Sequence, residues 1–364
     1  MRILYFSRDY STHDHRFLSA LAQSEHETYY LRLERIGHQL EDRPLPPQIR
    51  NVQWIGGKSS ASFRDGLRLL LDLKRVIRKI KPDLIQAGPI QRSALLVALA
   101  GFQPLLSMSW GYDLIVDAQR NAFWRWATSY TLKNSTMMLG DCRTIRDLAI
   151  SHGIPSDRIL TFPWGVDLSY FTPPAKTRPE DGVFTLLSTR SWEPIYGTEL
   201  IAKAFVMAAK EVPNLRLIML GNGSLAPALR DIFLKGKVSD RVIYPGQISY
   251  TNLPRYYQNA DLYLSASHSD GTSISLLEAM ACACPALVSD IPGNCEWVTP
   301  GENGWCFPDG DVWALGKAIL NAVDQRANLS RYGKIAREIV EQRADWHKNV
   351  NLLFDAYNRM CHHS

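Results

Sequence analysis

The chain has 364 residues, of which 46% are hydrophobic and 21% are charged, as in a globular protein large enough for two domains. Its six cysteines have no repeated metal-ligand spacing, and Cys282 and Cys284 are expected to be buried thiols in a reduced, cytoplasmic protein. The most apolar stretch, 94–110, is interrupted by glycine and proline, and no signal peptide is expected. These features argue against a disulfide-rich scaffold and an integral membrane protein.

Positive charge is concentrated in the first half of the chain. Residues 1–172 carry 22 Lys and Arg against 16 Asp and Glu, a net charge of +6, whereas the remainder has a net charge of −1. This asymmetry indicates either an anionic partner, such as phospholipid or a phosphate-bearing acceptor, or only a solvated basic face.

The first half alternates strand-length apolar runs with helical patterns. Strands are predicted at 2–7, 28–33, 51–55, 84–87, 105–109, 136–139 and 159–162. Helices are predicted at 16–23, 63–80, 93–100 and 144–152. This alternation is typical of a parallel sheet with helices on both faces, whose binding loops lie at the carboxyl ends of the strands.

The predicted helix at 63–80 combines an apolar stripe with many basic residues. The stripe consists of Phe63, Leu67, Leu70, Leu73, Ile77 and Ile80. The basic residues are Arg64, Arg68, Lys74, Arg75, Arg78, Lys79 and Lys81. Two interpretations stay open: a helix that covers the sheet with a charged outer face, or a face that rests on anionic lipid.

Two further segments of the first half contain candidate residues. Residues 104–113 are predicted to form a strand and a turn, from which Trp110, Gly111 and Asp113 would project toward whatever the sheet edge binds. The aromatic segment 121–126 is expected to lie in the core.

A linker rich in proline and charge is predicted at 169–182, between a first domain at 1–168 and a second at 183–345. Renewed alternation predicts a second parallel sheet, with strands at 184–189, 215–220, 241–244, 260–267, 286–288 and 304–307. Its helices are predicted at 197–210, 225–234, 253–257, 273–282, 312–324, 329–342 and 346–361.

The stretch 267–281 is predicted to be a strand end, a small-residue turn and a helix that begins at Ser273. The first N–H groups of a helix have no intrahelical partner and lie at the positive end of its dipole, so the expected ligand is a phosphate. Asp270 would lie beside it, and Glu278, two turns on, could accept hydrogen bonds from ligand hydroxyls. A purely structural role for either carboxylate stays open here.

Three other predicted strand ends carry candidate ligand groups. Arg190 directly follows an apolar strand and is expected to clamp a phosphate, unless it pairs with a local carboxylate such as Glu193. The segments 221–223, Gly-Asn-Gly, and 245–247, Pro-Gly-Gln, follow two more strands, although the first is also what a tight turn requires.

These motifs, in this order, resemble those of the retaining glycosyltransferases of family 4, whose GT-B fold places two Rossmann-like domains face to face around a cleft. The resemblance covers nearly the whole chain and is strongest at 188–190, 221–223, 246–248, 260–263, 269–281, 289–294 and 301–305. It implies an α/β GT-B fold, with a doubly wound parallel sheet in each domain and a final helix, 346–364, that crosses back to the first domain.

The resemblance implies that Asp270 meets hydroxyls of the donor sugar, that Glu278 binds the ribose, and that Arg190 binds the diphosphate. Backbone groups of 271–274 would hold the diphosphate, and Gln247 and Ile248 would lie near the base. The predicted donor-binding residues are Arg190, Tyr196, Asn222, Gln247, Ile248, Gly271, Thr272, Ser273, Ile274 and Glu278.

Three positions depart from the family pattern. Asp270 stands where the family has a glutamate, although the seven residues between the two acids are kept. Tyr196 stands in the place of a lysine, so half of the cationic clamp is missing. Trp110 occupies what looks like the place of a histidine before a glycine, and Asp113 nearby is a candidate catalytic residue with Asp270.

The resemblance implies transfer of a hexosyl group, with anomeric retention, from a UDP- or GDP-linked donor to a hydroxyl of a glycan, a lipid-linked or a small-molecule acceptor, without a metal or another cofactor. No nucleic acid is expected as a partner. Alternatives are a GT-B sugar-nucleotide epimerase or phosphorylase, and a nucleotide-sugar-binding protein with impaired catalysis. The expected location is cytoplasmic, at the inner face of the membrane if 63–81 contacts anionic lipid near a lipid-linked acceptor.

Overall fold

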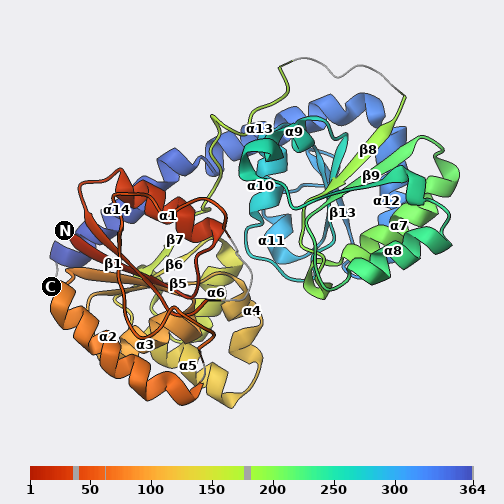
Figure 1. Cartoon of the computed structure of the whole chain (residues 1–364). Helices are drawn as coiled ribbons and strands as arrows, with labels where there is room; N and C mark the ends of the chain where they lie inside the picture. The colour runs from red at the N-terminus through yellow and green to blue at the C-terminus, as the bar shows by residue number, and fades with distance from the viewer. Residues whose placement is uncertain (36–40, 62, 176–181, 363–364) are drawn as a thin grey trace. The chain divides into compact units, whose positions relative to one another are not determined.

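The structure is a computed structural model that describes residues 1–35, 41–61, 63–175 and 182–362. The chain divides into two compact units (Figure 1), the first made of Met1–Phe162 and Val350–Ser364 and the second of Pro163–Asn349. Residues 176–181 of the predicted linker at 169–182 lie outside the described residues.

The first unit is built on a seven-stranded parallel sheet in the order β3-β2-β1-β4-β5-β6-β7. Its strands are β1 (Arg2–Ser7), β2 (Glu27–Arg32), β3 (Arg50–Asn51), β4 (Leu84–Gly88), β5 (Leu105–Met108), β6 (Met137–Gly140) and β7 (Ile159–Thr161). The central strands are buried on both faces, which explains their continuous apolar runs. Strand β3 is shorter than predicted, because Ile55 N–H bonds to the side chain of Asp72 and leaves the ladder.

Helices cover both faces of this sheet. They are α1 (Thr12–Ala22), α2 (Gly66–Ile80), α3 (Leu95–Ala100), α4 (Tyr112–Ile115), α5 (Ala122–Lys133), α6 (Arg143–Ser151) and α14 (Trp346–His362). Helices α1 and α14 lie on one face, and α2, α3 and α5 lie on the other (Figure 1). Tyr357 of α14 donates a buried hydrogen bond to Gln86 of β4, which ties the last helix to the first sheet.

Two predictions about side-chain burial in this unit are wrong. The buried face of α2 consists of Leu69, Leu73, Val76 and Ile80, whereas Leu67 is 71% exposed. Because leucines recur at 67, 69, 70, 71 and 73, the sequence permits several stripes, and packing against the sheet selects one of them.

The aromatic segment 121–126, expected in the core, is divided by its helical geometry. Only Trp124 is buried, whereas Phe123 and Trp126 are exposed. Adjacent positions on a helix point in different directions, so one aromatic run cannot be buried as a whole at the edge of a helical layer.

The second unit contains a six-stranded parallel sheet in the order β10-β9-β8-β11-β12-β13. Its strands are β8 (Phe184–Ser188), β9 (Leu215–Leu220), β10 (Val242–Gly246), β11 (Leu262–Ser265), β12 (Ala286–Ser289) and β13 (Gly304–Phe307). Its helices are α7 (Thr198–Glu211), α8 (Ala226–Lys235), α9 (Leu253–Gln258), α10 (Ile274–Ala281), α11 (Pro292–Cys295), α12 (Val312–Asp324) and α13 (Leu329–Arg343). Two α/β parallel sheets were predicted, and both are confirmed.

The second sheet separates two hydrophobic clusters. Leu186 and Leu187, neighbours on β8, belong to different clusters, as the alternation of side chains along a strand requires. Cys282 and Cys284 are buried, as expected. Within the described ranges, no helix combines the length and hydropathy needed to cross a bilayer.

Candidate active site

The strand order of the second sheet reverses between β8 and β11. Ligands of open parallel sheets bind at the carboxyl ends of the strands where such a reversal occurs. Arg190 follows β8, and Asp270 follows β11. The topology therefore brings two of the predicted site residues, which are 80 positions apart in sequence, to one point.

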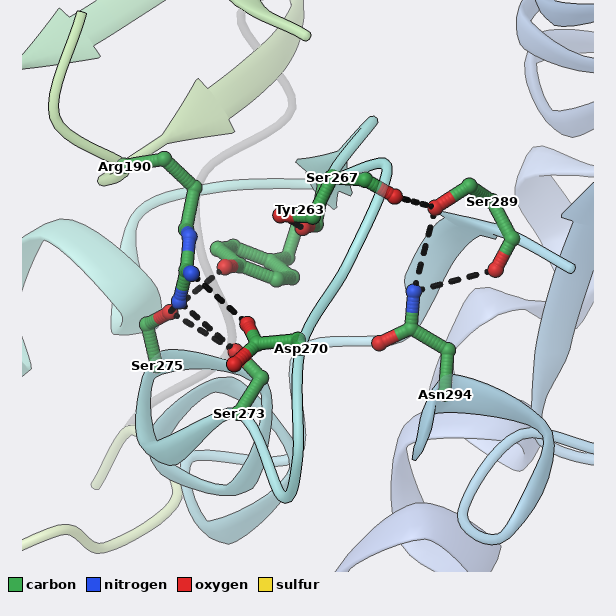
Figure 2. A network of polar contacts seen from close by, with 9 residues as sticks. Arg190, Tyr263, Ser267, Asp270, Ser273, Ser275, Ser289 and Asn294 are labelled. Atoms are coloured by element: carbon green, nitrogen blue, oxygen red, sulfur yellow. Dashed lines mark hydrogen bonds and ion pairs between the residues drawn. The ribbon is translucent and has the colours of Figure 1, made fainter. Parts of the chain in front are cut away.

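The guanidinium of Arg190 is the centre of a polar network, which Figure 2 shows. Its Nη2 donates to Asp270 Oδ2 at 2.6 Å, and its Nη1 donates to the hydroxyls of Ser273 and Ser275 at 3.0 and 3.2 Å. The side chains of Arg190 and Asp270 are only 13% and 20% exposed. Arg190 therefore pairs with the predicted sugar-binding acid, and the alternative pairing with Glu193 does not occur.

One nitrogen of Arg190 is left over from this network. The Nε atom is buried and makes no hydrogen bond to the described residues. A buried donor without an acceptor costs about 1–3 kcal/mol. An anion that accepts from Nε would remove this cost, so the geometry is suited to a bound phosphate oxygen.

Helix α10 begins at the same place. Its N-cap residue is Ser273, as predicted, but the Ser273 side chain does not cap the helix. The hydroxyl instead contacts Arg190 and Ser275. The side chain therefore leaves the first N–H groups of α10 to another acceptor, which is the property expected of a helix terminus that binds anions.

Tyr196 stacks on Arg190. The guanidinium carbon lies 4.1 Å from the centre of the Tyr196 ring, a cation–π contact. The next residue, Gly197, has a φ of +58°, and a Cβ there would lie 2.0 Å from the carbonyl oxygen of Ala266. This close approach fixes the loop of Tyr196 against the end of β11.

Glu278 is buried on α10, with 5% exposure. Its Oε2 accepts a hydrogen bond of 2.9 Å from Tyr257, whose hydroxyl also contacts Thr189 at 3.2 Å. Burial and the neighbouring Glu278 raise the pKa of Tyr257 well above its usual value, so Tyr257 stays a donor. Tyr257 of α9 therefore orients Glu278, and Thr189, which follows β8, contacts Tyr257 in turn.

A second layer of polar contacts fixes the loop of Asp270. Ser289 donates to the carbonyl oxygen of Ser267 at 2.6 Å, and Asn294 donates to the carbonyl oxygen of Ser289 at 3.0 Å (Figure 2). A Cβ on Gly293 would lie 2.2 Å from the carbonyl oxygen of Gly271. Sequence reasoning assigned no role to these residues, although the segment 289–294 was part of the family resemblance.

The electrostatics of the site favour a negatively charged ligand. Burial alone would lower the pKa of Arg190, but Asp270 and the surrounding tyrosines raise it above its usual value. Burial also raises the pKa of Tyr263, which contacts the Ser275 hydroxyl at 2.8 Å. Beside the Asp270 carboxylate, which pairs with Arg190, the site thus offers a permanent cation, neutral hydroxyls and a helix N-terminus.

Three predicted donor-binding residues lie apart from this network. Asn222 is exposed after β9, and its side chain accepts from Gly223 N–H within the turn. Gln247 is exposed after β10, two strands away from β8, and Ile248 packs partly against the core. Gly271 and Thr272 are buried between Asp270 and α10, and Ile274 begins that helix.

Asp113 does not project from its sheet, contrary to the prediction. It is 3% exposed, and both of its carboxylate oxygens accept hydrogen bonds. The donors are Ile90 N–H at 2.9 Å, the Ser109 hydroxyl at 2.6 Å, and the N–H groups of Trp110 and Leu114 at 3.1 Å each. Four donors within its own unit therefore hold the Asp113 carboxylate in place.

The sequence also contains an acidic pair, Asp309 and Asp311, with one residue between them. Asp309 contacts Nδ1 of His268 at 2.7 Å, and Asp311 caps α12 by accepting from Ala314 N–H. Among the residues that the structure describes, no group of three or more His, Cys, Asp or Glu side chains is arranged to hold a metal ion.

Comparisons with known proteins cover both halves of the chain. The model of the family Glycosyltransferase Family 4 matches residues 11–170, and that of Glycosyl transferases group 1 matches residues 172–339. A D-inositol 3-phosphate glycosyltransferase from Pseudarthrobacter chlorophenolicus is 25% identical over 222 residues, which are 58% of this chain. The match spans only 53% of that relative's length.

Solved structures with the same fold cover the whole chain. Sucrose-phosphate synthase from Thermosynechococcus elongatus has a TM-score of 0.81 at 18% identity and covers 100% of both chains. Anabaena Alr3699/HepE, solved in complex with UDP-glucose, has a TM-score of 0.79 at 16% identity, covering 98% of this chain and 100% of its own. These similarities confirm the GT-B fold. The two family models together match nearly the whole chain, and they show that it belongs to the glycosyltransferases of family 4.

Proposed function

We propose that the network around Arg190 binds the diphosphate of a nucleotide diphosphate sugar, and that the chain transfers the sugar to an acceptor hydroxyl. The observation that carries this proposal is the buried Arg190 guanidinium beside the start of α10, with its Nε unused. A diphosphate supplies the acceptor oxygens that both groups require. Glu278, about one turn along the same helix, is suited to bind the ribose hydroxyls.

Each side chain has a defined task in this proposal. Negative charge develops on the diphosphate as the bond to the sugar breaks, and Arg190 with the helix N-terminus stabilises that charge. Tyr196 orients the guanidinium through its ring, since it supplies no second cation. Asp270, within 2.6 Å of Arg190 Nη2, both holds the arginine and meets the sugar hydroxyls next to the diphosphate.

We further propose that transfer retains the anomeric configuration and needs no metal ion. In such a reaction the leaving diphosphate helps to remove the proton of the acceptor hydroxyl, and the protein contributes position and electrostatics. The support is that Arg190 and α10 supply positive potential directly at the diphosphate. Transfer in the presence of a chelator, with NMR assignment of the product anomer, tests both points.

For the donor we propose a UDP-linked sugar ahead of a GDP-linked one, supported by the UDP-glucose complex of Alr3699/HepE. For the acceptor we propose a glycan, a lipid-linked sugar or a small polyol. The inositol phosphate acceptor in the name of the P. chlorophenolicus relative fits the last class. Contact of 63–81 with anionic lipid at the inner face of a membrane would favour the lipid-linked acceptor.

A thermal-shift screen over UDP, GDP and ADP sugars tests the donor proposal, because a ligand that binds only the native state raises the melting temperature. We expect one nucleotide class to raise it in wild type and not in Arg190→Ala. No shift with any nucleotide sugar would contradict the proposal.

Mass spectrometry of the products separates transfer from the alternative reactions. A new glycoside formed from an added acceptor supports transfer. An isomerised donor or a sugar phosphate would instead indicate the epimerase or phosphorylase alternative. Donor binding without transfer or slow hydrolysis would indicate an impaired binding protein, for which the tyrosine at 196 is the motivating observation.

A further inference from the structure

The helices of the first unit between β3 and β7 carry most of the exposed apolar side chains of the described residues. Eleven large hydrophobic side chains are exposed among the described residues, and seven of them belong to α2–α6. The most pronounced are Leu67 and Leu71 on α2, at 71% and 55%, and Phe123 and Trp126 on α5, at 43% and 48%. Clustered exposure of this kind marks an interaction surface more often than a solvated one.

Helices α2 and α5 lie on the same face of the sheet. The crossovers from β3 to β4, β4 to β5 and β5 to β6 all run in one direction across the sheet. Since such crossovers are right-handed, their helices share a face. Helix α3 packs against both α2 and α5, and the three helices form one layer in Figure 1. Their outer surfaces therefore point away from the sheet together.

The outer surface of α2 is basic and apolar. Positions 64, 67, 68, 71, 75, 78 and 79 are exposed and follow one side of the helix. They comprise five basic residues and two leucines. Asp72 borders this side, where its carboxylate lies 3.7 Å from Arg75; its side chain is 17% exposed and also accepts from Ile55 N–H.

The exposed side chains of helix α5 are likewise apolar and basic. The rings of Phe123 and Trp126 lie 5.6 Å apart, and Trp126 stacks on Tyr130 at 5.4 Å. Arg125 and Lys133 are exposed on this helix, and its sequence contains no acidic residue. Tryptophan beside basic residues is typical of proteins that lie at the membrane–water interface.

We infer that the outer faces of α2 and α5, which we call the docking face, bind the surface of an anionic lipid bilayer, with Leu67, Leu71, Phe123 and Trp126 inserted among the headgroups. The inference extends the contact proposed for 63–81 to a second helix and is independent of the donor site. Charge complementarity selects lipid as the partner, since exposed cations surround the apolar side chains. Two copies of the chain related by a two-fold axis would instead oppose two basic faces.

Flotation with liposomes of phosphatidylcholine and phosphatidylglycerol, against phosphatidylcholine alone, tests the inference. We expect wild type to float only with the anionic liposomes. Phe123→Ala/Trp126→Ala and Leu67→Ala/Leu71→Ala should each lower the bound fraction about tenfold, because apolar burial is lost. The matched controls are Trp313→Ala and Leu234→Ala, which remove equally exposed side chains from the second unit and should bind as wild type does.

Charge reversal tests the basic part of the docking face. Arg68→Glu/Arg75→Glu/Arg78→Glu should weaken binding about 100-fold at low salt. The control Lys235→Glu/Lys317→Glu/Lys334→Glu carries the same charge change on the second unit and should bind more tightly than that variant. Arg190→Ala should float as wild type does, which separates docking from failure of the donor site.

Fluorescence locates Trp126 directly. Anionic liposomes containing brominated lipid should quench the protein, and Trp126→Phe should lose that part of the quenching. Circular dichroism establishes that each variant is folded. Equal flotation with neutral liposomes, equal loss in the control variants, or a fall in oligomer mass for Phe123→Ala/Trp126→Ala without loss of flotation would overturn the inference.

Discussion

The two sheets use carboxylates at their carboxyl ends in different ways. In the second unit, Asp270 and Glu278 contact side chains, Arg190 and Tyr257, that come from other elements. In the first unit, Asp14 and Asp113 accept hydrogen bonds that join parts of that unit. Asp14 accepts from Ser11 N–H in the capping box of α1 and from the Tyr5 hydroxyl, and Asp113 accepts from three backbone N–H groups and one hydroxyl.

This difference between the two units shows that a buried acidic residue does not by itself indicate a functional site. Burial raises the pKa of both Asp14 and Asp113 to about 6, the kind of shift that active sites often show. Yet hydrogen bonds occupy their oxygens. The second unit instead leaves a buried cation with an unused donor at a helix N-terminus. A group that still requires a partner is the better sign of a ligand site.

Among the variants of the second unit, Arg190→Ala should have the largest effect on transfer activity. Removing the cation at the centre of the network should lower kcat/KM about 100- to 1,000-fold, because the developing diphosphate charge loses its main partner. Steady-state transfer kinetics measure this change, with Arg230→Ala, an exposed arginine of the same unit, as the control. Equal activity in the two variants would show that Arg190 is structural.

Asp270→Ala should have the second-largest effect on transfer activity. We expect kcat to fall about 100-fold with a smaller change in donor affinity, since contacts to the sugar count most in the transition state. Steady-state kinetics measure kcat and calorimetry measures the donor Kd, so the effect on turnover can be separated from the effect on donor affinity. Asp231→Ala removes an exposed acid and serves as the control. A loss confined to Kd would contradict a role in turnover.

Glu278→Ala should weaken donor binding about 30-fold, because hydrogen bonds between ligand hydroxyls and a carboxylate are lost. Tyr257→Phe removes only the hydroxyl that orients Glu278 and should cost less than Glu278→Ala does. Calorimetric titration with the donor compares the two. If Tyr257→Phe weakens binding as much as Glu278→Ala, the carboxylate itself does not bind the ligand.

Tyr196→Ala should reduce donor affinity about tenfold, since the ring no longer holds the Arg190 guanidinium. Tyr196→Phe keeps the ring and should bind the donor within a factor of about two of wild type. A loss in the phenylalanine variant equal to that in the alanine variant would indicate that the hydroxyl, rather than the ring, is the important group.

Asp113→Asn should change stability rather than donor binding. The folded pKa of about 6 lies above the unfolded value, so between about pH 4 and pH 6 the folded state binds a proton that the unfolded chain has released. The Asp113 contribution to the free energy of unfolding therefore falls as the pH rises through this window, by up to about 3 kcal/mol. Urea unfolding should give a larger wild-type advantage at pH 4 than at pH 7, and a pH-independent difference would contradict this.

Much of the architecture could be predicted because strands of a parallel sheet leave clear apolar runs, as at β1 and β8. Arg190 and the turn before α10 could likewise be found, since their positions directly after strands restrict where they lie. Burial on the helices was less predictable. Leucine occupies five positions of α2, so several apolar stripes are possible. Packing against the sheet determines which of these stripes is buried.

Partners of individual side chains could not be predicted from their sequence positions. The pairing of Arg190 with Asp270 joins residues 80 positions apart, and Asp113 accepts a hydrogen bond from Ile90 N–H, 23 positions away. Likewise, the stacking of Tyr196 on Arg190 depends on the loop position that Gly197 permits. Such contacts depend on how separate elements pack together.

Calorimetric titration of UDP and GDP into wild type and Arg190→Ala, with a chelator present, tests most directly whether the network at the start of α10 is a nucleotide diphosphate site. We expect one of the two nucleotides to bind wild type with one-site stoichiometry and to bind Arg190→Ala at least about tenfold more weakly. Binding of neither nucleotide, or equal affinity for wild type and Arg190→Ala, would contradict the assignment of this site.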